Sequence, residues 1–222
     1  MPPVVEDALA LLRSGDPAGA EALVRQALAD ARRNGSEVAA LASACCDLGN
    51  VLFASGQLEQ AIEAYRQACS PADPADVVAS RNRLTYLVNL GEALAQHGSL
   101  AEAESALRES LKARRAFYGP EHPGFAFGLL PLAELVSTSG RPAEALLLAD
   151  DAVQVLWKDQ HPRVTSAIAA RGRIVAALGA DSPENAYAWL SPPADPILQE
   201  IVEGVLARFD GYWQGPAKLK RV

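Results

Sequence analysis

The stretch Leu90–Ala103, LGEALAQHGSLAEA, occurs in related form at three places in the chain. It reads as the end of one helix, a turn that contains a glycine, and the start of a second helix. Similar stretches surround Gly56 and Gly140, so the turn glycines recur with a constant 42-residue period. A fainter copy around Gly15 lies almost one period before Gly56. Such a fixed period is the signature of a repeat array, in which each unit buries its apolar face against its neighbours.

The composition of the 222-residue chain favours a helical repeat protein. Half of the residues are hydrophobic but only 6% are aromatic, whereas a sheet protein is richer in aromatic and β-branched residues. The net charge of −7 gives no overall attraction to nucleic acid or to an anionic membrane. No apolar run reaches the roughly 18 residues of a membrane span. We therefore expect no nucleic acid and no membrane among the partners.

The N-terminus and the cysteines indicate the location of the protein. Residues 1–7 contain no basic segment followed by an apolar core, so they do not read as a secretory signal. Three cysteines do not form a disulfide framework. Cys45 falls on an apolar helical stripe and is expected in the core, whereas Cys46 and Cys69 are expected to be exposed thiols. These features predict a cytoplasmic protein, and the abundance of Ala, Arg and Gly indicates a bacterial one.

Helix start and stop signals divide the chain into helix pairs. Gly15 ends a helix, Asp16 caps the next one, and Pro17 suits its first position. The same reasoning, applied along the chain, predicts five pairs at about 4–33, 37–70, 76–117, 123–157 and 162–190, followed by a capping helix at 196–209.

The 42-residue register continues across the loop at 70–76, so we interpret this loop as a connection between repeats rather than as a domain boundary. One domain is therefore expected at residues 1–210, with residues 211–222 as a flexible tail.

Small residues inside the predicted helices indicate close helix crossings. Gly49 and Ala61 in one pair, and Gly91 and Ala103 in the next, are expected to face each other. Larger side chains would push the helix axes beyond the usual separation of roughly 8–10 Å.

Leucine, glycine, alanine and tyrosine recur at fixed places, namely Leu48, Gly49, Gly56, Ala61, Tyr65 and Ala68; Leu90, Gly91, Gly98, Ala103 and Leu107; and Leu132, Ala133, Gly140, Ala145 and Ala149. In these positions the chain resembles the tetratricopeptide repeat (TPR) family. The 42-residue period and the Gly119–Pro123 loop are similar to its longer, kinesin-light-chain-type subclass. The resemblance implies an all-α fold, a right-handed α-α superhelix (TPR solenoid) of about five helix pairs plus a C-terminal capping helix. It is strongest over 37–157 and weakest over 158–190.

The residues suited to chemistry do not form a recognisable catalytic or metal site. His97, His122 and His161 lack the spacing of zinc ligands, and the cysteines provide no C-x-x-C pair. A nucleophile elbow, a phosphate-binding glycine loop and a triad order are also missing from the sequence. We predict structural or neutral roles for the three histidines, no enzymatic activity, no metal and no cofactor.

The predicted helix at 100–117 carries many charged side chains. Opposite charges three or four positions apart on a helix indicate a solvated outer face. The residues assigned to this face are Glu102, Glu104, Arg108, Glu109, Lys112, Arg114 and Arg115.

In TPR arrays the first helix of each pair lines a concave groove that holds a peptide or a partner segment. The resemblance assigns three groups of residues to this groove: Cys46, Asp47 and Asn50; Thr85, Asn89 and Glu92; and Phe127, Leu130 and Glu134. In the 42-residue register Asn50, Glu92 and Glu134 are equivalent, so they are expected to form one column.

Asn50 and Asn89 match places where peptide-binding TPR domains hold a ligand's backbone. Cys46, Phe127 and Pro131 stand where a carboxylate clamp requires Lys or Arg, so the resemblance disfavours such a clamp.

We therefore predict a non-enzymatic protein-protein interaction module or scaffold that binds a partner peptide or segment in its groove. The acidic groove residues favour a partner with Lys or Arg flanked by apolar residues, which would meet Phe127 and Leu130. The same carboxylates also fit a plain solvated helix face. Alternative functions are a peptide-sensing regulator and an assembly or secretion chaperone, and the terminal repeats could form a homodimer.

Overall fold

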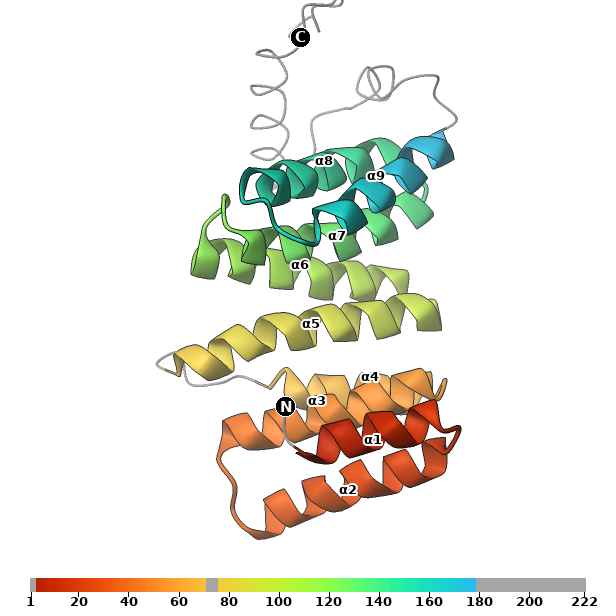
Figure 1. The fold of residues 1–222 in the computed structure, drawn as a ribbon, viewed down its shortest axis with the longest axis vertical. Coiled ribbons are helices and arrows are strands. Elements are labelled where there is room, and N and C mark those ends of the chain that lie inside the picture. The colour runs from red at the N-terminus through yellow and green to blue at the C-terminus, as the bar shows by residue number, and fades with distance from the viewer. Residues whose placement is uncertain (1–2, 71–75, 179–222) are drawn as a thin grey trace, which may run out of the picture. The chain divides into compact units, whose positions relative to one another are not determined.

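The computed structural model describes residues 3–70 and 76–178 (Figure 1). These residues form helices and no strand: α1 (Pro3–Arg13), α2 (Pro17–Arg33), α3 (Val38–Ala54), α4 (Leu58–Ala68), α5 (Val77–His97), α6 (Leu100–Tyr118), α7 (Pro123–Thr138), α8 (Pro142–Lys158) and α9 (Val164–Leu178). The described helix ends agree with the predicted pairs to within two residues. The helix ending near 190, the capping helix at 196–209 and the tail at 211–222 lie outside the described residues.

The chain divides into two compact units, with the boundary inside α6 between Ser110 and Leu111. Unit 1 comprises the residues up to Ser110 and unit 2 those from Leu111 onward. The expectation of one continuous domain at 1–210 stays a prediction.

The repeated turns form because glycine can adopt a left-handed backbone. Gly98 has a φ angle of 92° directly after α5, a conformation that strains most other residues. The amide of Ser99 donates to the carbonyl of Leu94 at 2.9 Å, which completes a Schellman-type helix end. The predicted cap of α2 is confirmed, since Asp16 Oδ1 accepts the amide of Gly19 at 2.8 Å.

In unit 1, each of the helices α1 to α4 packs against the next one in the chain, and α3 also contacts α1 and α5 (Figure 1). The helices α1, α3 and α5 therefore share one layer, which is the arrangement expected of the first helices of successive repeats.

Two glycines allow close packing in unit 1. A Cβ atom on Gly49 would lie 2.5 Å from Tyr65 Cε1, and one on Gly91 would lie 2.6 Å from Leu107 Cγ and 3.3 Å from the carbonyl oxygen of Ala103. The predicted close crossing of Gly91 and Ala103 is thus confirmed. Gly49 lies against the ring of Tyr65, one turn beyond Ala61.

In unit 2, α8 packs between α7 and α9, and α7 also contacts α9. Phe125, Leu129 and Leu132 of α7 are fully buried. The buried carboxylate of Asp150 on α8 forms an ion pair with Arg171 of α9.

The prediction that Arg114 belongs to a solvated face is wrong. This residue is only 6% exposed. Its Nη1 donates to the carbonyl oxygen of Gly124 at 2.9 Å, and a Cβ atom on Gly128 would lie 2.8 Å from its Cδ. The long arginine stem packs against Gly128 of α7, while the guanidinium binds the backbone carbonyl of Gly124.

Candidate partner-binding surface

Two asparagines meet where α3 and α5 lie side by side. Asn89 Nδ2 donates to Asn50 Oδ1 at 3.1 Å, and the hydroxyl of Tyr65 donates to the same oxygen at 2.9 Å. Asn50 is exposed and Asn89 half-buried. The side-chain carbonyl oxygen of Asn89, Oδ1, has no partner among the described residues. The pair therefore presents polar amide groups at the surface, held in place from below by a buried tyrosine.

The expectation of an exposed thiol at Cys46 is wrong. Cys46 is 6% exposed, and Asn89 Nδ2 lies 3.6 Å from its sulfur. Burial raises the pKa of the Cys46 thiol to about 12. This side chain thus lies beneath the asparagine pair as a neutral packing group. Cys45 is buried as predicted, and Cys69 is half-buried.

The other predicted groove residues of unit 1 lie near the asparagine pair. Thr85 and Glu92 are exposed on α5. Burial, with added effects of Cys46 and Glu92, raises the pKa of Tyr65 well above its ordinary value, so Glu92 acts electrostatically on the tyrosine that holds Asn50.

Asp47 lies one helical turn before Asn50 and is half-buried. It forms no hydrogen bond or ion pair within the part of the chain that the structure describes. Burial raises the pKa of its carboxyl to about 6, because desolvation disfavours the charged form.

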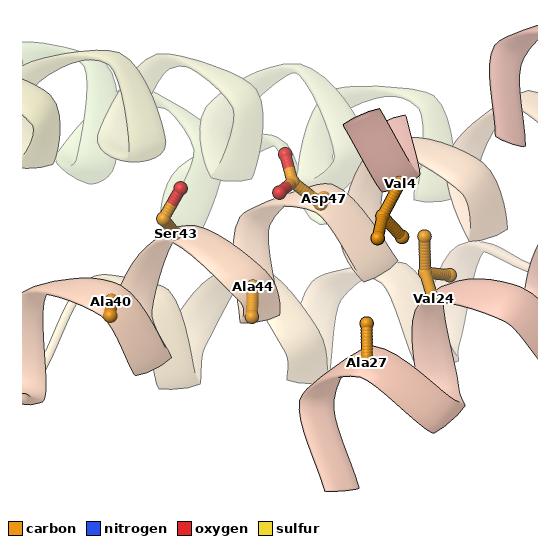
Figure 2. Close-up of a pocket in the computed structure, with 7 residues that line it drawn as sticks. All are labelled: Val4, Val24, Ala27, Ala40, Ser43, Ala44 and Asp47. Atoms are coloured by element: carbon orange, nitrogen blue, oxygen red, sulfur yellow. The ribbon is translucent and has the colours of Figure 1, made fainter. Parts of the chain in front are cut away.

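A pocket of about 310 Å³ opens beside this carboxylate. Figure 2 shows that the residues lining it come from α1, α2 and α3. Its lining residues are Val4, Val24, Ala27, Ala40, Ser43, Ala44 and Asp47. Sequence reasoning missed the contributions of α1 and α2, because Val4, Val24 and Ala27 read as ordinary positions of apolar helix faces.

The predicted groove residues of unit 2 are engaged by residues of α9 and of the turn that precedes it. Arg173 forms an ion pair with Glu134. The guanidinium carbon of Arg163 lies 4.9 Å from the ring centre of Phe127, and the ring of His161 contacts Phe127 edge-on at 5.2 Å. In unit 2, therefore, the negative charge of Glu134 is compensated by Arg173. Leu130 is half-buried on the same helix.

Asn50–Asn89 and Glu134–Arg173 are equivalent pairs in the repeat. Within each pair the two residues are 39 positions apart in the sequence. The second pair follows the first by two full repeat periods. Arg173 was not predicted from the sequence because the fifth repeat matches the repeat pattern weakly. Its position nevertheless lies one 42-residue period after Pro131.

The same register explains why Asp47 has no partner in the described part of the chain. Asp47 and Asn89 both lie nine residues before a turn glycine. The place on α1 that corresponds to Asn50, six residues before its turn glycine, is taken by Leu9, which offers no polar group.

Two of the three histidines take the structural roles predicted for them. His122 Nδ1 accepts the amide of Gly124 at 2.9 Å, which caps α7, and its ring stacks on Tyr118. His161 Nδ1 accepts the amide of Arg163 at 3.1 Å. His97 is exposed beside Ser99.

Within residues 3–70 and 76–178, no group of three or more His, Cys, Asp or Glu side chains could hold a metal ion. Of the helices described, none combines the length and the apolar character needed to cross a membrane.

Several solved structures share the fold. The kinesin-light-chain TPR-like repeats of Podosopora anserina are 21% identical, with a TM-score of 0.66 over 96% of this chain and 95% of theirs. BtubC (BKLC) from P. vanneervenii is 18% identical, with a TM-score of 0.68 over 97% of this chain and 83% of its own. The apo form of RapI is 10% identical, with a TM-score of 0.66 over 94% of this chain and 63% of its own. At these identities the likeness concerns the fold alone.

The family comparison agrees with the fold. None of the curated proteins matches the sequence significantly, but the model of the MalT-like TPR region matches residues 8–202. The prediction of an all-α TPR solenoid is confirmed. This fold is a scaffold for protein–protein interaction, and its family is generally non-enzymatic. The chain therefore belongs to the TPR family, as a MalT-like TPR region.

Proposed function

We propose that the chain is a protein-interaction module that binds an extended segment of a partner protein along the α3–α5 face of unit 1. The observation that carries this proposal is the contact between Asn50 and Asn89. Asn50 Oδ1 accepts hydrogen bonds from Tyr65 and Asn89, so both side-chain amides are held in fixed orientations. The side-chain oxygen Oδ1 of Asn89, which has no partner among the described residues, can accept a peptide N–H. A pre-oriented amide pair suits an extended backbone, which offers both donors and acceptors.

The charges beside the pair favour a cationic segment. Asp47 has no counter-charge among the described residues. In unit 2 the equivalent Glu134 binds Arg173. A contact of Phe127 and Leu130 with apolar partner residues stays a prediction, because Arg163 and His161 already lie against the Phe127 ring. The face of unit 1 is therefore the first place to test.

The proposal is tested with a fully degenerate heptapeptide library, capped at both ends, applied to the immobilised full chain. Asn50→Ala/Asn89→Ala should retain about tenfold less peptide, which corresponds to roughly 1.4 kcal/mol for lost backbone hydrogen bonds. The matched control is Gln26→Ala/Gln67→Ala, which removes two exposed amides of α2 and α4 and should retain as much peptide as the wild type.

Circular dichroism establishes that both double variants are folded. If the folded asparagine double variant retains as much peptide as its control, the proposed surface is not the binding surface. If the wild type retains no peptide, the proposed function itself is contradicted.

A further inference from the structure

The pocket between α1, α2 and α3 has the dimensions of a side-chain site. Its volume of about 310 Å³ lies at the lower end of the roughly 300–1,000 Å³ typical of ligand pockets. In Figure 2, Val4 and Val24 lie beside the turn of α3 that bears Asp47, and Ala27 lies below Ala44. Such a space suits one long side chain rather than a large ligand.

The lining of the pocket is divided chemically. Five of the seven lining residues are Val or Ala, and the polar ones are Ser43 and Asp47. Both polar side chains extend from α3 toward the same side in Figure 2. An occupant that matches this lining has an apolar stem and a cationic end.

We infer that this pocket binds one lysine side chain of the partner segment, with the four-carbon stem against the valines and alanines and the ammonium group at Asp47. The inference rests on the proposed function, because Asp47 and Asn50 lie on adjacent turns of α3 and a segment held by the asparagine pair passes the pocket.

The donor count selects lysine over arginine. An ammonium group has three donors. The two carboxylate oxygens of Asp47 accept from it, and the Ser43 hydroxyl, which also hydrogen-bonds with Tyr86, has a second lone pair that provides a third acceptor. A guanidinium group has five donors in a fixed fork, and the apolar walls would leave some of them without acceptors, which is unfavourable.

The repeat register explains why an external cation is needed. The residue equivalent to Asp47 in the next repeat, Asn89, binds Asn50, and Arg173, farther along the register, binds Glu134. For Asp47, the residue of the preceding repeat that would take the place of Asn50 or Glu134 as a partner is Leu9, which is apolar. Its carboxylate is partly desolvated without compensation, and a bound ammonium group supplies the missing charge.

The test compares four heptapeptide libraries with lysine, norleucine, arginine or alanine fixed at the central position and the other positions degenerate. Norleucine keeps the four-carbon stem of lysine and lacks the charge. On the immobilised full chain, the lysine library should be retained about tenfold more than the norleucine library, and more than the arginine library.

Two variants remove this preference by different routes. Asp47→Asn keeps the shape of the side chain and should bring lysine and norleucine retention to the same level. Ala27→Leu fills the pocket and should do likewise. Ala29→Leu, an exposed position on the same helix, is the matched control and should keep the preference. Asn50→Ala/Asn89→Ala should lower retention of all four libraries by the same factor.

The outcomes separate this inference from the proposed function. Equal retention of lysine and norleucine by the wild type, or a lysine preference that survives Asp47→Asn, overturns the pocket inference. If the asparagine double variant still loses peptide in that case, the proposed function stands. Retention of none of the libraries contradicts the proposed function, and the pocket inference is overturned with it.

Discussion

The pairs Asn50–Asn89 and Glu134–Arg173 occupy the same places in the repeat but differ in chemistry. The first is a neutral amide pair held by a buried tyrosine, beside a carboxylate without a partner. The second is an ion pair in which both side chains are largely exposed, at 52% and 65%. The comparison teaches that the repeat keeps the contact between neighbouring first helices and varies the groups that make it. At these places unit 1 has two neutral amides, and unit 2 has a glutamate paired with its own arginine.

The largest expected effect concerns the support of α7, the helix that carries Glu134. Arg114→Met removes the charged hydrogen bond to the Gly124 carbonyl and should lower the free energy of unfolding by about 1.5–3 kcal/mol. Urea denaturation measures it. Lys112→Met, at an exposed position of the same helix, should stay within about 0.5 kcal/mol of the wild type. Equal effects of the two changes would contradict the buried role of Arg114.

The next effect concerns the support of the asparagine pair in unit 1. Gly49→Ala brings a methyl group onto the ring of Tyr65. Overpacking of roughly 1–3 kcal/mol, offset by a helix-propensity gain of about 1 kcal/mol, should leave a net loss of up to about 2 kcal/mol.

Gly172→Ala is the matched control for Gly49→Ala. Nothing lies within 4 Å of a Cβ atom at Gly172 in α9, so this change should stabilise the protein by up to about 1 kcal/mol. Chemical denaturation of both variants gives the sign of each effect. A stabilising Gly49→Ala would contradict the close contact with Tyr65.

Double-mutant cycles to alanine compare the two pairs directly. The coupling free energy of Asn50 and Asn89 should be about 0.5–1.5 kcal/mol and insensitive to salt. That of Glu134 and Arg173 should be about 0.2–1 kcal/mol and should fall as salt screens the exposed charges. Denaturation in low and high salt measures both. A salt-sensitive Asn50–Asn89 coupling would break the comparison.

The smallest effect is the pH dependence contributed by Asp47. Its folded-state pKa of about 6 lies above the ordinary value of 3.8. Between these values the folded state holds a proton that the unfolded state releases, so stability contributed by this group rises as pH falls from 7 to 5. Cys46 and Tyr86, the described groups on which the charge of Asp47 acts, have raised pKa values and stay neutral in this range.

Asp47→Asn should abolish this contribution and should be more stable than the wild type at pH 7. Urea denaturation at pH 7 and pH 5 gives the free energy of unfolding of both proteins. The titration of other groups cancels in the difference between the two values. A wild-type advantage at pH 7 would mean that Asp47 is already stabilised by a partner.

The helix pairs could be predicted from the sequence because their signals are local. Gly98 and Asp16 form turns and caps with residues a few positions away, and the 42-residue period carries that information along the chain. The contact between Gly91 and Ala103 was also predictable, since both residues belong to one repeat.

Contacts between repeats were harder to predict. Arg114 reads as one charge among many on its helix, and only the packing against Gly128 of α7 shows that it is buried. The partner of Glu134 lies 39 residues away in a repeat with few matching residues. The pocket beside Asp47 depends on how α1 and α2 meet α3, which no periodicity specifies.

The most direct test of the account is a titration followed by NMR. The side-chain amide resonances of Asn50 and Asn89 and the Nε resonance of Arg173 are recorded while the heptapeptide most enriched from the fixed-lysine library is added to the full chain. The account predicts that both asparagine resonances shift with one common Kd and that the Arg173 resonance stays in place. A shift of Arg173 with unchanged asparagines would contradict the assignment of partner binding to unit 1.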